Sequence, residues 1–179
     1  LQREFLARIH NEEPPPAVDL AWLRLKELVP QLQFSTEDLL STSYGPDFEE
    51  VITSNDVVLI DFWTYSCINC QRTLPYVTGW YKAYEDKGLV IIGVHTPEFA
   101  FEHVKANVED AAKRFGVTYP IVLDNRYETW TAFGNQYWPR KYLVDIDGFV
   151  VYDHIGEGVY AETETKIKEL LKERANRLG

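Results

Sequence analysis

The sequence predicts an α/β protein in which helices flank a central mixed β-sheet. Continuous apolar runs of strand length alternate with helical apolar stripes through most of the chain, an order that is typical of α/β folds. The pair Asp147-Gly148 joins the last two strand-like runs and indicates a β-hairpin. Parallel strands linked through helices, followed by one antiparallel hairpin, make the predicted sheet mixed.

The first strand and the helix after it carry the clearest signals. Residues 57–63 form an apolar run that is interrupted only by Asp61, which suits a strand buried on both faces of a sheet. Residues 70–84 carry apolar side chains at helical spacing, with Pro75 inside the stripe. We therefore expect a strand that leads directly into a helix with a kink at the proline.

The elements that follow continue the alternation. They are predicted as a strand over 89–95, a helical stripe over 101–115 that ends at Gly116, a strand over 119–123, a short helix over 127–133, strands over 141–146 and 149–154, and a charged amphipathic helix over 161–174. The predicted order is β–α–β–α–β–(α)–β–β–α, so helices would cover both faces of the sheet.

Residues 1–46 are predicted to form a helical extension or linker before a single domain at 47–179. Helical stripes over 1–9 and 18–32 are separated by three successive prolines, and residues 35–38 resemble a helix start. The sequence contains no methionine, even at position 1, and we expect it to be a piece of a longer or processed protein.

Composition narrows the classes of function. The formal net charge is −10, which argues against nucleic acid and anionic membrane surfaces as general partners. No apolar run reaches the roughly 18 residues that a membrane-spanning helix needs. The chain has 2 cysteines, and both belong to one CxxC.

The CxxC motif, Cys67 to Cys70, directly follows the first predicted strand and begins the first predicted helix. A thiol attacks as its thiolate, and the positive end of a helix dipole favours that form. We therefore predict that Cys67 attacks a partner disulfide and that Cys70, one turn later, resolves the mixed disulfide.

The alternative for this motif is half of a structural zinc site. A zinc site needs a second pair of ligands, and the sequence has neither a second CxxC nor a histidine pair at ligand spacing. The redox interpretation is therefore favoured, and no metal is predicted.

Longer sequence motifs resemble the thioredoxin superfamily. The segment DFWTYSCINC at 61–70, Pro75 five residues after the CxxC, and Trp138-Pro139 before a strand match its active-site segment, its helix proline and its cis-proline loop. The strand–helix element around 89–115 resembles the insertion of the TlpA/ResA branch. The strings at 63–75, 93–102 and 134–139 most resemble the thioredoxin domains of DipZ-type proteins, and NHL-repeat proteins share a similar CINC.

This resemblance implies a thioredoxin fold and an extracytoplasmic place in the cell envelope, within a longer membrane-attached protein. It also implies protein disulfide substrates and a CcdA-like membrane electron donor. No soluble cofactor is implied, since a Cys67–Cys70 disulfide itself carries two electrons. The bond before Pro139 is expected to be cis, which would expose the backbone of Trp138 to a substrate chain.

Asp61 is the third predicted catalytic residue. A carboxylate within an apolar strand should have a raised pKa because burial disfavours its charge. Its predicted role is to accept the proton of Cys70, as the resemblance also implies. The alternative is a strand-end aspartate that is solvated or caps a neighbour, but an unpaired buried carboxylate without a function would be a stability cost.

Further residues are predicted to surround the thiols. Trp63, Tyr65, Tyr137 and Trp138 are expected to form an aromatic rim that binds substrate, the alternative being core packing. His95 and Glu98 follow the second strand and are predicted to tune Cys67, with a structural histidine as the alternative. Arg140 and Lys141 would stabilise the thiolate or steer an acidic partner, or else begin a solvated strand.

The CxxC therefore predicts a thiol–disulfide oxidoreductase, and the resemblance implies that it reduces disulfides of exported proteins. A disulfide-donating oxidase stays open, because Ile68-Asn69 between the cysteines does not define the direction of electron flow. A copper-binding, metallochaperone-like module is the alternative from another class, because soft thiolates suit copper(I).

Overall fold

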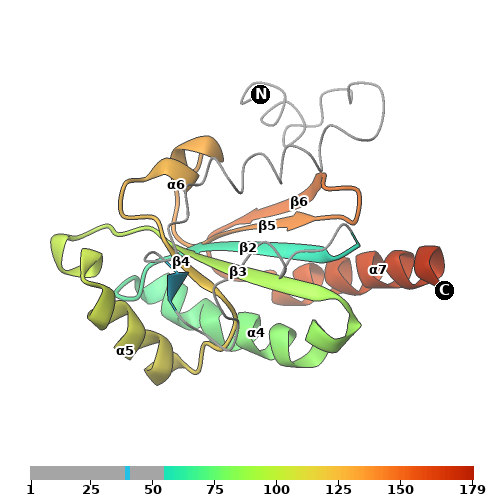
Figure 1. Cartoon of the computed structure of the whole chain (residues 1–179), viewed down its shortest axis with the longest axis horizontal. Coiled ribbons are helices and arrows are strands. Elements are labelled where there is room, and N and C mark those ends of the chain that lie inside the picture. The colour runs from blue at the N-terminus through green and yellow to red at the C-terminus, as the bar shows by residue number, and fades with distance from the viewer. Residues whose placement is uncertain (1–38, 41–54) are drawn as a thin grey trace.

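The computed structural model describes residues 39–40 and 55–179, which build a six-stranded sheet with strand order β1-β4-β3-β2-β5-β6 (Figure 1). The strands are β1 Leu39–Leu40, β2 Val57–Trp63, β3 Leu89–His95, β4 Ile121–Leu123, β5 Arg140–Val144 and β6 Val150–Ile155. Strand β2 lies between β3 and β5, and all seven of its residues are buried. The CxxC follows this strand, so it begins from a rigid position in the sheet.

The sheet is mixed, as predicted. Strand β3 runs parallel to β2 and to β4, whereas β5 is antiparallel to β2 and to β6. The turn of the β5–β6 hairpin has Gly148 at φ 83°, a left-handed conformation that favours glycine. Asp145 stabilises this turn because its carboxylate accepts from the backbone N–H groups of Asp147 and Phe149.

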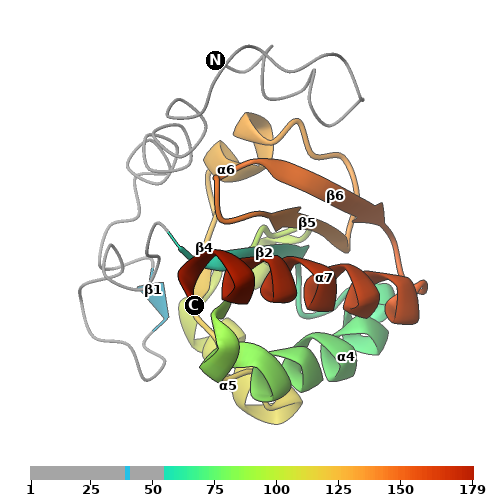
Figure 2. The ribbon, with the colours of Figure 1, turned by 90° about the vertical axis from the view of Figure 1, so that its right-hand side faces the viewer.

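The helices cover the two faces of the sheet unequally. Helices α4 Ile68–Tyr84, α5 Lys105–Phe115 and α7 Tyr160–Leu178 lie on one face, and the short α6 Glu128–Ala132 lies on the other (Figures 1 and 2). Each face of β2 therefore packs into its own apolar core, with Leu59 and Trp63 in the first and Ile60 and Phe62 in the second. The prediction that helices flank both faces is confirmed.

The predicted continuous helical stripe over 101–115 is wrong at its start. A 3-10 helix, Ala100–His103, comes first, and Val104 is extended at φ −78° and ψ 110° before α5 begins at Lys105. The side chain of Glu102 accepts hydrogen bonds from the backbone N–H groups of Glu98 and Phe99. These bonds stabilise residues 98–104, the bend after β3, as an element separate from α5.

Two residues of the predicted extension belong to the sheet. Leu39 and Leu40 pair antiparallel with β4, as an edge strand and not as the continuation of a helix. The helices expected over 1–9 and 18–32 and the helix start at 35–38 lie outside the described residues, and the domain boundary at 46 stays a prediction. Among the helices within 55–179, none is both long and apolar enough to cross a membrane.

Candidate active site

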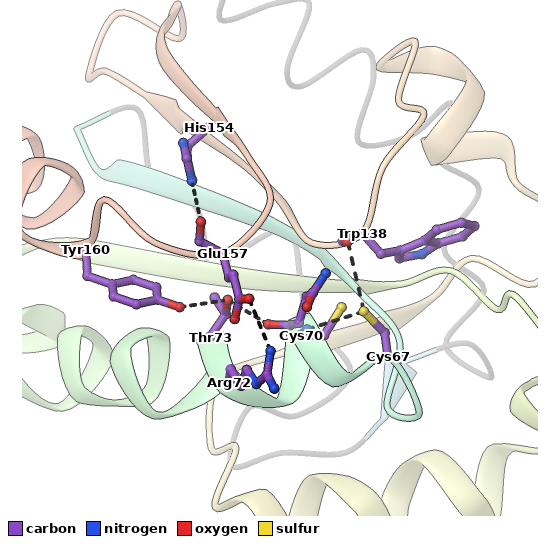
Figure 3. A network of polar contacts seen from close by, with 9 residues as sticks. Cys67, Cys70, Arg72, Thr73, Trp138, His154, Glu157 and Tyr160 are labelled. Atoms are coloured by element: carbon purple, nitrogen blue, oxygen red, sulfur yellow. Dashed lines mark hydrogen bonds and ion pairs between the residues drawn. The ribbon is translucent and has the colours of Figure 1, made fainter.

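Cys67 occupies the N-cap of α4, and residues 64–66 connect it to the end of β2. Its sulfur accepts a hydrogen bond from the backbone N–H of Cys70 at 3.3 Å, and its thiol donates to the carbonyl oxygen of Trp138 at 3.9 Å (Figure 3). The predicted position at a helix N-terminus is therefore confirmed. Both cysteines are free thiols in this structure.

The two thiols differ in acidity. Hydrogen bonding from the Cys70 side chain is the main reason why the pKa of Cys67 falls from 9.0 to about 7, with help from the backbone N–H groups of Cys70 and Asn69 and against the effect of burial. Cys70 is buried, and burial raises its pKa far above the ordinary thiol value. At neutral pH the structure thus holds one partly exposed, ionisable thiol and one buried, protonated thiol.

The loop before β5 faces the CxxC. The peptide bond between Trp138 and Pro139 is cis, as expected. The indole N–H of Trp138 donates to the carbonyl oxygen of Thr96 at 3.0 Å, and its ring packs against Trp130 at 4.1 Å between centroids. These contacts hold the Trp138 backbone beside the Cys67 sulfur.

Asp61 lies in the middle of β2 and is 1% exposed, so the alternative of a solvated strand-end aspartate is wrong. Within the described residues, neither of its carboxylate oxygens has a hydrogen-bond partner. Burial raises the pKa of Asp61 from 3.8 to about 6, and the charge of Lys141 opposes that shift. The charge of Asp61 in turn raises the pKa of Cys70, which shows that the two groups interact.

Lys141 and Arg140 do not begin a solvated strand, and that alternative is wrong. Lys141 is fully buried and Arg140 is nearly so, because β5 lies inside the sheet between β2 and β6. Arg140 pairs with Asp153 at 2.6 Å. Lys141 stands opposite Asp61 in the antiparallel pairing of β5 with β2, so its charge acts on the carboxylate.

The predicted aromatic rim is wrong for Trp63, which is fully buried. Along β2 its side chain shares a face with Val57 and Leu59, and that face packs on the three larger helices. Tyr65 and Trp138 are partly exposed and Tyr137 is 48% exposed, so these three can still meet a docked chain.

His95 and Glu98 lie in different surroundings. His95 is fully buried, contacts the Thr64 hydroxyl at 3.3 Å and stacks on Tyr65. Burial lowers its pKa to about 4, so the ring is neutral at physiological pH. Glu98 is exposed, and its negative charge raises the pKa of Cys67 slightly against the other influences. The tuning role of His95 stays a prediction.

Glu102 was not predicted and is the most connected side chain beside the thiols. It is fully buried and accepts hydrogen bonds from the Ser66 hydroxyl at 2.5 Å, the Ser66 N–H, and the N–H groups of Glu98 and Phe99. Burial alone would raise the pKa of Glu102, but these hydrogen bonds lower it. Glu102 thus ties the bend after β3 to the residue that precedes Cys67.

The connection between β6 and α7, together with the first residue of α7, contacts the second turn of α4 (Figure 3). Arg72 pairs with Glu157 at 3.3 Å, and the Thr73 hydroxyl meets the hydroxyl of Tyr160 at 3.4 Å. The Arg72–Glu157 pair is exposed and contributes little stability. The two contacts place the start of α7 beside the helix that carries the CxxC. In the part of the chain that is described, no three His, Cys, Asp or Glu side chains are grouped to hold a metal ion.

Comparison with known proteins places this geometry in a family. The Redoxin family matches residues 30–171. Protein DipZ of Mycobacterium tuberculosis is 58% identical over 117 residues, which are 65% of this chain and 17% of DipZ. Thiol-disulfide oxidoreductase ResA of Geobacillus thermodenitrificans is 37% identical over 93 residues, or 52% of this chain and 51% of ResA. The chain therefore spans a small part of the DipZ relatives.

Solved structures agree on the fold. A thioredoxin-like protein in its oxidized form superposes with a TM-score of 0.62 at 26% identity, covering 68% of this chain and 85% of the other. StoA from Bacillus subtilis superposes with a TM-score of 0.56 at 23% identity, covering 64% and 84%. The predicted thioredoxin fold is confirmed, and the chain belongs to the Redoxin family, with relatives of the ResA and DipZ type.

Proposed function

We propose that this chain reduces disulfide bonds of exported proteins, with electrons that it receives from a CcdA-like membrane partner. The observation that carries this proposal is the asymmetry of the two thiols. Cys67 is partly exposed with a pKa of about 7, and Cys70 is buried behind it with a raised pKa. A pair of this kind suits attack by the first thiol and resolution by the second.

In the first step the Cys67 thiolate attacks one sulfur of the substrate disulfide. A Cys67–substrate disulfide forms, the substrate disulfide breaks, and the leaving thiolate takes a proton from solvent. In the second step Cys70 gives its proton to the Asp61 carboxylate and attacks the Cys67 sulfur. The Cys67–Cys70 disulfide forms, the second substrate thiolate leaves, and the substrate has gained two electrons.

The acidity of Cys67 supports a reductase more than an oxidase. Thioredoxin has an attacking thiol with a pKa of about 7, whereas the strong oxidant DsbA has one near 3.5. Cys67, at about 7, lies at the thioredoxin end of this range. Titration against glutathione tests the direction: a potential near −270 mV supports reduction, and one near −120 mV would favour the oxidase alternative.

Trapping tests the order of the two steps. In Cys70→Ser the mixed disulfide at Cys67 should persist and hold the substrate covalently, so that partners can be isolated under non-reducing conditions. The matched control is Cys67→Ser, which keeps the buried thiol and should trap nothing. A stable adduct in the control and none in Cys70→Ser would contradict the proposal.

The copper-binding alternative has a direct test. Reduced protein is mixed with copper(I), and the bound metal is compared with the rate of insulin reduction. We expect insulin reduction, whereas stoichiometric copper retention without turnover would contradict the proposed function. His95 stands opposite Trp63 in the strand pairing, and its ring is buried between Trp63 and Tyr65, which does not favour a metal ligand.

A further inference from the structure

The connection between β2 and α4 is a tight turn that determines where Cys67 lies. The backbone N–H of Cys67 donates to the carbonyl oxygen of Thr64 at 3.3 Å. From α4, the side-chain amide of Gln71 donates to the carbonyl oxygen of Tyr65 at 2.9 Å. Thr64 is fully buried, whereas Tyr65 and Ser66 are partly exposed. The sulfur of Cys67 therefore keeps its place at the N-cap of α4 only while this turn is held.

Glu102 joins this turn to the bend after β3, with one carboxylate oxygen for each. Its Oε1 accepts hydrogen bonds from the hydroxyl of Ser66 at 2.5 Å and from the Ser66 backbone N–H at 3.4 Å. Its Oε2 accepts from the backbone N–H groups of Glu98 at 2.5 Å and Phe99 at 2.9 Å. A buried carboxylate is costly unless donors surround it, and Glu102 is fully buried. The turn and the bend are therefore held by the same charge.

The hydroxyl of Thr64 connects His95 to the same carboxylate. Its oxygen lies 3.3 Å from Nε2 of His95. Against the effect of burial, hydrogen bonding from the Ser66 and Thr64 side chains lowers the pKa of Glu102. A hydroxyl has a single hydrogen and a carboxylate only accepts, so Thr64 donates to Glu102 and accepts from the Nε2–H of His95. Nδ1 of this neutral ring then carries no hydrogen, and it has no hydrogen-bond partner within the described residues.

We propose that Glu102 is a positioning residue for the attack by Cys67, because its carboxylate gathers the Ser66 and Thr64 side chains and so holds the turn that keeps the Cys67 sulfur at the start of α4. His95 takes part through Thr64, whose hydroxyl it directs toward the carboxylate. Glu102 itself gains and loses no proton in either step of the reaction. Its kinetic meaning rests on the proposed function, in which Cys67 is the attacking thiol.

The acidity of Cys67 reports its position. Hydrogen bonding from the Cys70 side chain, together with the backbone N–H groups of Cys70 and Asn69, lowers the pKa of Cys67 from 9.0 to about 7. A sulfur displaced from the N-cap would lose these contacts, and its pKa would return toward 9.0. If Glu102 acted on Cys67 only through its negative charge, its removal would lower the pKa instead. The sign of the change therefore separates positioning from charge.

The titratable groups around Glu102 are His95 on β3 and Tyr127 before α6, which both interact with it electrostatically. Burial lowers the pKa of His95 to about 4 and raises that of Tyr127 above 10.0, so both are neutral near pH 7. The exposed His103 next to Glu102 acts on His95 through its charge. Glu102 is ionised near pH 7, because its hydrogen bonds outweigh burial. Its charge is therefore constant while Cys67 titrates.

The ionisation of Cys67 can be measured without substrate, from the ultraviolet absorbance of the thiolate in the reduced full chain. Glu102→Gln should raise the pKa of Cys67 by about one pH unit, the size expected when hydrogen bonds to a thiolate are lost. The thiolate fraction at neutral pH should then be about fivefold lower. Ser66→Ala, which keeps the buried charge, should raise the pKa by a smaller amount. Ser66→Thr keeps the hydroxyl and should retain the wild-type value.

Thr163→Val is the matched control for loss of stability. Thr163 is a fully buried residue of α7 whose hydroxyl lies 3.0 Å from that of Tyr152 and donates to the carbonyl oxygen of Val159 at 3.2 Å, outside the turn and the bend. Its loss should destabilise the fold and leave the pKa of Cys67 unchanged. An unchanged or lowered pKa in Glu102→Gln and Ser66→Ala, or an equal rise in Thr163→Val, would overturn the positioning role.

The His95 ring gives a spectroscopic readout of the same network. In the reduced full chain labelled with ¹⁵N-histidine, the ring of His95 is assigned by comparison with His95→Gln. At neutral pH its hydrogen should be on Nε2 in the wild type and in Ser66→Ala, which keeps the charge of Glu102. In Glu102→Gln this preference should weaken, because the Thr64 hydroxyl is no longer directed toward a carboxylate. A hydrogen on Nδ1 in the wild type would mean that Thr64 donates to His95, and would overturn the network.

The two proposals can fail separately. If Glu102→Gln and Ser66→Ala raise the pKa of Cys67 but the wild-type chain does not reduce insulin, the proposed function alone is contradicted. If the chain reduces insulin and Cys70→Ser traps substrate, but neither variant raises the pKa of Cys67, the positioning role of Glu102 alone is contradicted.

Discussion

Asp61 on β2 and Glu102 on the bend after β3 are both buried acids beside the CxxC, yet their pKa values move in opposite directions. Burial raises the pKa of both. Glu102 accepts several hydrogen bonds and ends below its ordinary value, whereas Asp61 accepts none within the described residues and rises to about 6. Hydrogen bonding to the charged form, more than burial, thus decides whether an acid here stays ionised or exchanges protons.

Local structure explains why the two acids differ. Asp61 lies in a strand with sheet partners on both sides, where backbone N–H groups are used between strands. Glu102 lies in a bend where the N–H groups of Glu98 and Phe99 point back to its carboxylate. The first acid is therefore suited to proton transfer, and the second is suited to hold the loop that carries Cys67.

The largest expected effect comes from removing the charge of Glu102. Glu102→Gln should lower the free energy of unfolding by about 3–5 kcal/mol, because an amide presents a donor to groups that are themselves donors, and hydrogen bonds to a charged acceptor are strong. Urea unfolding at neutral pH measures the loss. Because the pKa of Glu102 is lowered from 4.5 in the folded protein, its contribution is present above that pH and declines as the pH falls through the folded value.

Glu98→Gln is the matched control for that change. Glu98 is an exposed acid four residues earlier, and it contributes to the Glu102 site through its backbone N–H, which the substitution keeps. The unfolding free energy of the Glu98→Gln variant should stay within about 0.5 kcal/mol of the wild-type value. Equal losses in the two variants would contradict the view that Glu102 stabilises the loop through its side chain.

Asp61→Asn should raise the free energy of unfolding, whereas Glu102→Gln lowers it. A folded pKa of about 6 against 3.8 means that the folded protein binds the proton more tightly, so stability falls as the pH rises from 3.8 to about 6. This difference between the two pKa values corresponds to about 3 kcal/mol. The reduced variant should be more stable than the wild type by up to about this amount above that range, and similar to it at lower pH.

Urea unfolding of the reduced protein at several pH values tests this. If Asp61→Asn keeps the wild-type dependence of stability on pH, that dependence arises from a group other than Asp61. If Asp61→Asn is less stable than the wild type at high pH, the surroundings of Asp61 stabilise its negative charge as fully as the hydrogen bonds of Glu102 stabilise that of Glu102.

The sequence allowed the catalytic strand and helix to be predicted because their signals are local. The apolar run of β2, the cysteines at the start of α4 and the Asp147-Gly148 turn each define their own structure. Asp61 could be singled out because a charge within an apolar run is unusual.

The role of Glu102 and the burial of Lys141 could not be predicted, because the surroundings of both residues come from distant parts of the chain. Glu102 looks like a polar position of a helix, and its partner Ser66 is 36 residues away. Lys141 looks like a solvated strand start, but β6 covers the outer side of β5. For Trp63 a signal was available, because its alternation with Val57 and Leu59 places it on the core face of β2.

The smallest expected effect concerns the exposed acid. The negative charge of Glu98 raises the pKa of Cys67, so Glu98→Gln should lower that pKa from about 7 by a fraction of a pH unit. The pH dependence of iodoacetamide alkylation measures it. Because Glu98 is exposed, the difference between variant and wild type should vanish at about 1 M salt, where the screening length is about 3 Å. A difference that persists at high salt would mean that Glu98 acts on Cys67 through structure, as Glu102 does, and not through its charge.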